Sequence, residues 1–275
     1  MDILRFGTAG IPLSTQKPST LTGIARVREL GLDCMELEFV HSVNVSKELA
    51  PAVKKTAQDN DIILTAHGQY YINLNAQEKE KMHASIQRVL NAARILHLCG
   101  GYSLTFHAGF YLGMDKPVVY DTIKKNMQLI TKTLHDEGNN VWVRPETTGK
   151  ETQWGDLQEI LNLSRDVEHV MPCIDFSHLH ARYNGRNNTK QEFSALLGQV
   201  EKTLGKEGLQ NMHIHISGIN YGEKGEKNHL LLKESDFNYT DLLLTLKSFN
   251  VRGCVICESP NIEGDAVLLQ KTFGG

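Results

Sequence analysis

Histidine, aspartate and glutamate stand at the ends of several short apolar runs in this sequence. His67 and His107 end two such runs, at residues 62–67 and 103–107, and Glu146 ends another at 141–146. The pattern returns later in the chain at Asp175, His178, His213, His215 and Glu258. Imidazole and carboxylate groups together are ligands for Zn²⁺ and, less selectively, for Mn²⁺ or Fe²⁺. These residue types predict a metal centre if the ends of the runs meet in space.

Each of these residues, taken alone, has an ordinary structural explanation. A histidine at a strand end is commonly held by hydrogen bonds, and an aspartate there commonly caps the next helix. The whole set is harder to explain in this way, because six consecutive runs carry such a residue at the same end. We therefore interpret the set as ligands.

Eight β-branched or apolar runs alternate with segments of helical periodicity along the chain. The predicted strands are 3–7, 34–39, 62–67, 103–107, 141–146, 170–175, 212–217 and 254–258. This alternation predicts an α/β protein, a (β/α)8 TIM barrel that occupies residues 1–275 as a single domain. An open nucleotide-binding sheet is a weaker match, because "FGTAGIP" after the first run lacks the GxGxxG spacing. Residues 182–190 and 218–229 are polar and are predicted to be long loops.

A barrel brings the carboxyl ends of all its strands to one rim, where barrel enzymes carry their active sites. The predicted ligands on this rim are too many for one ion. Glu146 is the most central carboxylate and is expected to bridge two ions about 3.5 to 4 Å apart. A water activated between two ions is a nucleophile suited to phosphodiesters. Glu146 and Glu258 are the expected catalytic carboxylates.

Composition excludes several classes of protein. The net charge of −3 argues against a protein that binds nucleic acid by bulk positive charge. Neither a signal peptide nor an apolar run of about 18 residues is found, so no membrane association is expected. Five cysteines without framework spacing indicate reduced thiols and a cytoplasmic protein. The CxxC at Cys254 and Cys257 lies in a predicted strand, which argues against a shared metal site there.

Several motifs together resemble one family of enzymes. They are "AHGQYYINL" (66–74), "FHAG", "PETTG", "CIDFSHLHA", "HIHISG", "KNH" and "CESP", in this order through nearly the whole chain. Their order and spacing resemble endonuclease IV, the apurinic/apyrimidinic endonuclease of DNA repair. The resemblance implies a barrel with a zinc cluster, which cleaves the DNA backbone on the 5′ side of abasic sites.

The resemblance also assigns roles to residues. His67 and His107 would hold one zinc ion, and Glu146 would bridge it to a second ion. Asp175, Glu258 and a histidine of the seventh strand would complete the second position, with His215 favoured and His213 as the alternative. His178 and His229 would hold a third zinc ion. Tyr70 would contact DNA, and Asn73 would either contact substrate or fix its own loop.

The sequence departs from the family at several positions. Lys227-Asn228-His229 replaces an Asp-Arg-His motif, so the third ion is expected to be weak, absent or bound by a shifted group such as Glu226. Residues 40–48 lack the arginine and aromatic residues that contact DNA in the family, and His107-Ala108-Gly109 replaces a His-Pro-Gly motif. Arg182 and Lys227, among other basic residues of the two polar loops, are candidate phosphate contacts.

The leading hypothesis is a zinc-dependent hydrolase with two ions, with Mn²⁺ as the alternative ion, and abasic DNA as the partner of a monomeric protein. The alternative is a sugar isomerase or epimerase with one or two divalent metals, because that group has a similar barrel and rim. A barrel that binds metal without catalysis is a third hypothesis. It fits less well, because the set of predicted metal ligands is complete. If these ligands were vacant, their clustered carboxylates would repel one another.

Overall fold

The computed structural model describes residues 2–275, and in it the chain closes into a barrel. The barrel strands are β1 (Leu4–Ala9), β2 (Cys34–Glu38), β3 (Ile63–His67), β4 (Ser103–Phe106), β6 (Trp142–Pro145), β8 (Cys173–Asp175), β9 (Met212–Ile216) and β12 (Gly253–Cys257). Within the described residues they pair in parallel, in the order β6-β4-β3-β2-β1-β12-β9-β8. Parallel bridges from Val143 to Val170 and from Glu146 to Cys173 join the two ends of this sheet. The predicted (β/α)8 TIM barrel is confirmed.

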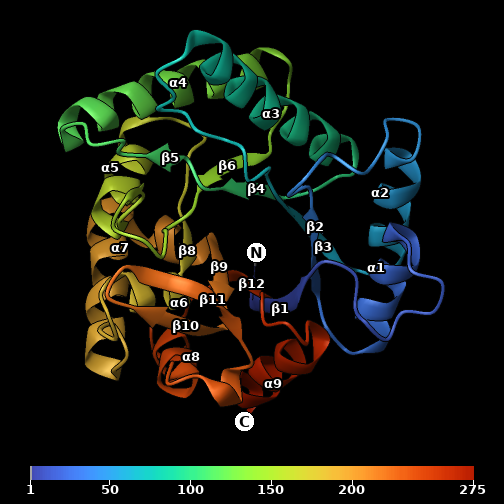
Figure 1. Cartoon of the computed structure of the whole chain (residues 1–275). Coiled ribbons are helices and arrows are strands. Elements are labelled where there is room, and N and C mark those ends of the chain that lie inside the picture. Colours follow the sequence, from blue (N-terminus) through green and yellow to red (C-terminus); the bar gives the residue numbers. More distant parts are fainter. Residues whose placement is uncertain (1) are drawn as a thin grey trace.

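Helices surround the barrel on the outside, as Figure 1 shows in a view along the barrel axis. They are α1 (Thr20–Glu29), α2 (Ala50–Asp59), α3 (Lys79–Leu98), α4 (Lys116–Asp136), α5 (Leu157–Asp166), α7 (Lys190–Gln210), α8 (Tyr239–Ser248) and α9 (Glu263–Gly274). The short helix α6 (Phe176–Arg182) and the 3-10 helix η1 (Leu232–Glu234) lie beside β10 (Gly218–Gly222). Each long helix buries an apolar face against the strands. On α5, for example, Ile160, Leu161 and Leu163 are fully buried. Helix periodicity thus fixes which face of each connection covers the barrel.

All eight predicted strands are present, with ends within two residues of those expected, except that β8 begins at Cys173, three residues after its expected start. The strands could be recognised in the sequence because a parallel barrel strand is buried on both faces and is therefore apolar along most of its length. The ends of the strands could be recognised for the same reason, since the first polar side chain after such an apolar run lies at the rim.

Residues 218–229, which were predicted to be a long loop after the seventh strand, contain regular structure. They form an antiparallel hairpin of β10 (Gly218–Gly222) and β11 (Gly225–Leu230), in which Gly222 pairs with Gly225 across a two-residue turn. Gly225 has φ of 86°, a conformation that glycine adopts without steric cost. Helix α6 also covers the first residue of the other predicted loop, Arg182, and a short second hairpin pairs β5 (Gly109–Phe110) with β7 (Gln153–Trp154).

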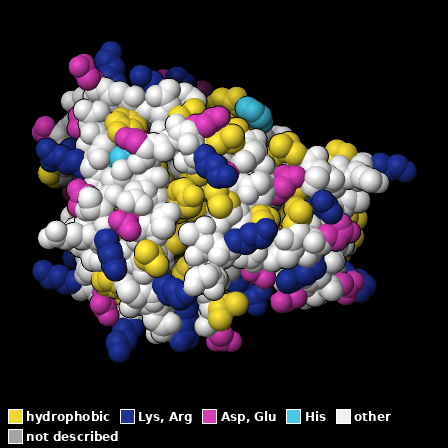
Figure 2. All heavy atoms as spheres, turned by 90° about the horizontal axis from the view of Figure 1, so that it is seen from below, with side chains coloured by type: hydrophobic (Ala, Val, Ile, Leu, Met, Phe, Trp, Pro, Cys, Tyr) yellow, Lys and Arg dark blue, Asp and Glu magenta, His cyan; other side chains and the backbone are white. Residues whose placement is uncertain are grey.

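The outer surface carries charges of both signs. Figure 2 shows lysine and arginine side chains interspersed with aspartate and glutamate over the side that it presents. This mixture agrees with the small net charge of −3. Among residues 2–275, no helix combines the length and the apolarity that a bilayer span requires.

Candidate metal centre

Side chains with metal-binding chemistry converge on the carboxyl-terminal rim of the barrel. They stand at strand ends, as the last residue of β3 or β8 or just after β4, β6 or β12, except for one in β9, one in α6 and one in β11 of the hairpin. The predicted ligands form three overlapping groups, within each of which the ligand atoms lie within 4.8 Å of one another. These groups are His67, His107 and Glu146; Glu146, Asp175, His215 and Glu258; and Asp175, His178 and His229. Cys173, His213 and His215 form a fourth group by the same measure. All eight predicted ligands are thus brought together, and their binding of metal stays a prediction.

Glu146 lies between the first two groups, with one carboxylate oxygen turned toward each. Its Oε2 is 3.2 Å from Nε2 of His67 and 3.5 Å from Nε2 of His107. Its Oε1 is 3.3 Å from Nδ1 of His215. The side chain is 1% exposed, so its direction is set by the protein interior. A carboxylate in this position suits a bridge between two ions.

The second group contains His215, whose Nδ1 also lies 3.3 Å from Oε2 of Glu258. Asp175 completes the group and is fully buried. The alternative histidine of the same strand, His213, faces the barrel interior, where its Nδ1 is 2.8 Å from the hydroxyl of Ser103. The geometry therefore favours His215 as the ligand from β9.

Three histidines of the centre are held in the same way. Nδ1 is 2.7 Å from the carbonyl of Gly68 in His67, 3.0 Å from the carbonyl of Thr147 in His178, and 3.1 Å from the carbonyl of Glu258 in His229. A carbonyl only accepts hydrogen bonds, so Nδ1 carries the proton in each of these contacts. In a neutral imidazole, Nε2 then has the free lone pair, and metal-ligating histidines usually have this arrangement.

Glu36 supports His215 from inside the barrel and was not identified from the sequence. It lies in β2, is fully buried, and has Oε1 2.9 Å from Nε2 of His215. Its Oε2 is 3.0 Å from Nε2 of His213 and accepts a hydrogen bond of 2.7 Å from Thr65. A carboxylate that binds one ring nitrogen of a ligand histidine orients the ring and fixes its tautomer. In the sequence, only the two glutamates of the otherwise apolar "CMELEF", Glu36 and Glu38, could have pointed to this role.

The charges of the centre shift one another's pKa strongly. Burial lowers the pKa of His67, but the Glu146 carboxylate outweighs burial and raises the pKa to about 10. Burial raises the pKa of Asp175 to about 7, although the charge of His178 opposes it. Burial also tends to raise the pKa of Glu258, but the charge of His215 brings it down to about 2. The protein without ions therefore carries protons on groups that an ion would need deprotonated.

Ion binding is expected to release protons and to strengthen with pH. With a pKa of about 10, His67 is protonated near pH 7, so an ion must displace its proton. Each released proton makes the apparent affinity rise about tenfold per pH unit below that pKa. Calorimetric titration with Zn²⁺ in buffers of different ionisation enthalpy measures this release at pH 7. A binding heat that is the same in all buffers would contradict the expectation.

Buried polar atoms without hydrogen-bond partners provide a test of whether metals fit. Within residues 2–275, several such atoms face the centre: Oε1 of Glu146, Oδ2 of Asp175, Nδ1 of His215, Nε2 of His229 and Oε2 of Glu258. Leaving a buried polar group unsatisfied costs about 1 to 3 kcal/mol. Ions at the three groups would satisfy these atoms, and the mixture of imidazole and carboxylate ligands fits Zn²⁺ or Mn²⁺.

The predicted substrate-binding residues lie in different surroundings. Tyr70 is 61% exposed, and its ring centroid is 6.0 Å from that of His67, so it faces outward beside the first group. Asn73 holds its own loop, since its Oδ1 accepts a hydrogen bond of 3.0 Å from the backbone of Asn75. Lys227 is exposed on the hairpin. Tyr70 and Lys227 are therefore accessible, while Asn73 has the loop-fixing role that was the alternative.

Arg182 is directed into the protein. It is 4% exposed, and its Nη1 donates to the hydroxyl of Thr148 at 2.9 Å and to the carbonyl of Gln153 at 3.1 Å. These acceptors belong to the segment that follows Glu146. The guanidinium thus holds the backbone beside the metal centre, and we do not assign it to substrate. This structural role could not be predicted from the sequence, because Arg182 is far from these acceptors along the chain.

His180 connects α6 to the hairpin and is likewise structural. Its Nε2 is 3.1 Å from Oδ1 of Asp236, and the hydroxyl of Tyr221 donates to Oδ2 of the same residue at 2.6 Å. Through Asp236, the helix that carries His178 is joined to the hairpin that carries His229.

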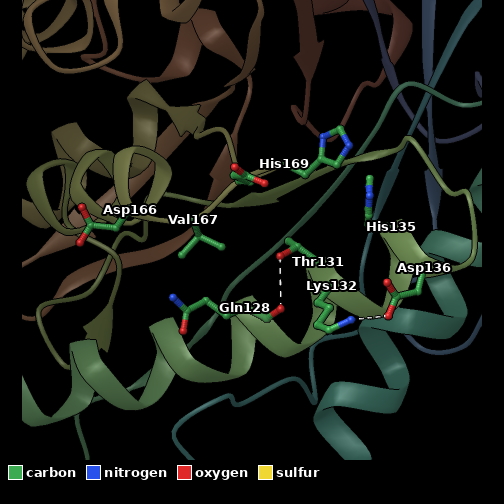
Figure 3. Close-up of a pocket in the computed structure, with 9 residues that line it drawn as sticks. Gln128, Thr131, Lys132, His135, Asp136, Asp166, Val167 and His169 are labelled. Atoms are coloured by element: carbon green, nitrogen blue, oxygen red, sulfur yellow. Dashed lines mark hydrogen bonds and ion pairs between the residues drawn. The ribbon is translucent and has the colours of Figure 1, made fainter.

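A separate pocket lies at the other end of the barrel. It is lined by the last turns of α4 and by the segment after α5, with Lys132, His135, Asp136 and His169 among its residues (Figure 3). Helices end where strands begin, so this pocket is remote from the carboxyl-terminal rim. Lys132 forms an ion pair of 2.6 Å with Asp136, as the dashed line in Figure 3 marks.

The chain is similar in sequence to an uncharacterized protein and, at lower identity, to a probable endonuclease. An uncharacterized protein of Methanocaldococcus jannaschii is 48% identical over 271 residues, covering 98% of this chain and 97% of that protein. A probable endonuclease 4 of Aquifex aeolicus is 22% identical over 219 residues, covering 76% of each chain.

Solved structures agree on the fold. Endonuclease IV from Thermus thermophilus has a TM-score of 0.73 at 16% identity, covering 97% of this chain and 99% of that one. A D-tagatose 3-epimerase-like protein also has a TM-score of 0.73, at 14% identity, covering 97% of this chain and 96% of that one. The fold alone therefore does not separate the two activities. The family model described as "Xylose isomerase-like TIM barrel" matches residues 24–271, and this chain belongs to that family.

Proposed function

We propose that this chain is a metal-dependent phosphodiesterase that cleaves the DNA backbone on the 5′ side of abasic sites. The observation that carries the proposal is the third ligand group. His178 and His229 lie beside the pair of groups that Glu146 joins, and their ring centroids are 5.7 Å apart. A sugar isomerase needs only one or two ions, and these would leave His178 and His229 without an ion to bind.

Divalent ions held by these groups would lower the pKa of a bound water and neutralise charge on the phosphate. The protein's own contribution is to fix the ligands before substrate arrives. His67, His178 and His229 are oriented through backbone carbonyls, and His215 is oriented through Glu36. Prearranged charges of this kind need no reorganisation during the reaction.

Exposed aromatic side chains beside the ligands support nucleic acid as the substrate. Tyr70 and Tyr71 are each 61% exposed, and Phe110 is 36% exposed. Tyr70 follows His67 by three residues, and Phe110 follows His107 by three. Aromatic rings at such a rim can stack on bases or occupy the gap that an abasic site leaves. The sequence relationship to a probable endonuclease 4 supports the same activity.

Glu38 favours the second candidate, a sugar isomerase or epimerase. This residue ends β2 at the rim, and its Oε1 is buried without a hydrogen-bond partner among the described residues. Burial raises its pKa to about 8, and the charge of Glu36 contributes to the increase. A carboxyl group that is neutral at pH 7 can donate a hydrogen bond to a sugar hydroxyl.

The two candidates are separated by one set of assays. The chain, reconstituted with Zn²⁺ or Mn²⁺, is incubated with an end-labelled duplex that contains one tetrahydrofuran abasic analogue. We expect incision on the 5′ side of the analogue and none in the matched intact duplex. Failure to cut with Zn²⁺, Mn²⁺ or Mg²⁺ would reject the phosphodiesterase. In that case, deuterium incorporation from D₂O into a ketohexose would support the epimerase.

A further inference from the structure

The third ligand group needs an additional anionic ligand beyond Asp175. Oδ1 of Asp175 caps α6 by accepting from the backbone nitrogen of His178 at 2.7 Å, and the same residue belongs to the second group. The position two residues before His229, at which the resemblance leads one to expect an aspartate, is Lys227. A histidine pair with a lysine would bind a divalent ion poorly.

Glu226 lies where that additional ligand is needed. Its Oε2 is 3.6 Å from Nε2 of His178, and its Oε1 is 3.9 Å from Nε2 of His229. Nε2 is the ring nitrogen that both histidines have free, since Nδ1 of each donates to a backbone carbonyl. Ligands at 2.0 to 2.1 Å from a tetrahedral Zn²⁺ are about 3.3 Å apart. The two contacts are made by different oxygens of the carboxylate, so a rotation of the Glu226 side chain would be needed to bring it and both histidines onto one ion.

A β-bulge explains how Glu226 reaches this place. Asn220 pairs with Asn228 and Tyr221 pairs with Glu226, so Lys227 is an extra residue in β11. In a regular strand, Lys227 would share a face with His229. The bulge removes Lys227 from the alternation. Lys227 is exposed and lies over Gly222, where an added Cβ would be 3.0 Å from its Cε.

The segment after β6 fixes Glu226 from the other side. The backbone nitrogen of Glu226 donates to the carbonyl of Gly149 at 2.9 Å. A Cβ added at Gly149 would be 2.6 Å from Cβ and 2.7 Å from Oε2 of Glu226, so only glycine leaves room for this carboxylate. The side chain of Glu226 is 17% exposed, in contrast to the open surface around Lys227.

We propose that Glu226 is a ligand of a third metal ion together with His178 and His229, and that the bulge at Lys227 brings it there. This inference rests on the proposed metal centre, but it concerns the number of ions and does not depend on which substrate is cleaved. Compared with the family motif, the carboxylate is absent at position 227 and present at position 226. The bulge places Glu226 on the face of the strand that carries His229.

The test is the metal content of E226Q and of the matched control E223Q. Glu223 is exposed in the turn of the same hairpin, so its substitution makes the same chemical change away from the centre. Each protein is saturated with Zn²⁺, dialysed against a weak chelator and analysed for bound zinc by mass spectrometry. Circular dichroism checks that the variants are folded.

We expect about three zinc ions per chain in the wild type and in E223Q, and one fewer in E226Q. The G149A variant should also lose that ion, because the added methyl group displaces the carboxylate. Equal zinc content in E226Q and the wild type would overturn the proposal, whether that content is two ions or three. The count is independent of DNA incision, so a failure of the proposed function and a failure of this inference are distinguishable.

Discussion

Replacing Glu146 with glutamine is expected to abolish turnover while the barrel stays folded. Its two oxygens lie between the first and second ligand groups, 3.2 Å from Nε2 of His67 and 3.3 Å from Nδ1 of His215. Glutamine has nearly the same shape but no negative charge, and it cannot bridge two cations as a carboxylate does. Loss of a central electrostatic contribution costs about 10² to 10³ in rate, and loss of an ion costs more. We expect a decrease of at least about 10³ in the rate of incision of abasic duplex.

The matched control for this prediction is E151Q. Glu151 lies in the same segment after β6 but is exposed to solvent. We expect E151Q to retain the wild-type zinc content, whereas E146Q should lose zinc from the first two groups. Far-ultraviolet circular dichroism shows whether both variants are folded. If E146Q incises the duplex at the wild-type rate, Glu146 does not bridge ions.

The positions of the rim residues could be predicted from the sequence because a local pattern determines where they stand. A run such as 170–175 is apolar until Asp175, and the barrel places every such end on the same rim. Residue type and strand end were thus enough to bring His67, Glu146 and Glu258 together. No knowledge of the loops was required.

The supporting contacts could not be predicted, because they join residues far apart in the chain. Glu36 and His215 are on strands that are not neighbours in the sheet, so only the closed barrel brings them within 2.9 Å. The bulge at Lys227 depends on how β10 pairs with β11, and a one-residue change in pairing moves a side chain to the other face. Sequence periodicity carries no information on either feature.

Glu36 is the second residue whose replacement should have a large effect, and the effect should be on metal affinity. Its Oε1 serves His215, while Oε2 serves His213 and Thr65. Without the carboxylate, Nε2 of His215 loses the negative charge 2.9 Å away that favours a proton on this nitrogen and leaves Nδ1 for the centre. Removing such a partner typically weakens metal binding 10- to 100-fold. We expect that loss in E36Q, which retains the shape of the side chain.

Competition with a fluorescent zinc chelator measures this loss, and T65V is the matched comparison. That variant removes one hydrogen bond of 2.7 Å to Glu36 but leaves its charge beside His215, so its zinc affinity should change much less. Because Glu36 acts through His215, we expect excess zinc to restore most of the activity of E36Q, which it should not do for E146Q. Zinc binding by E36Q as tight as in the wild type would mean that packing in β9 alone orients His215. Recovery by excess zinc therefore distinguishes a residue that positions a ligand from a residue that is one.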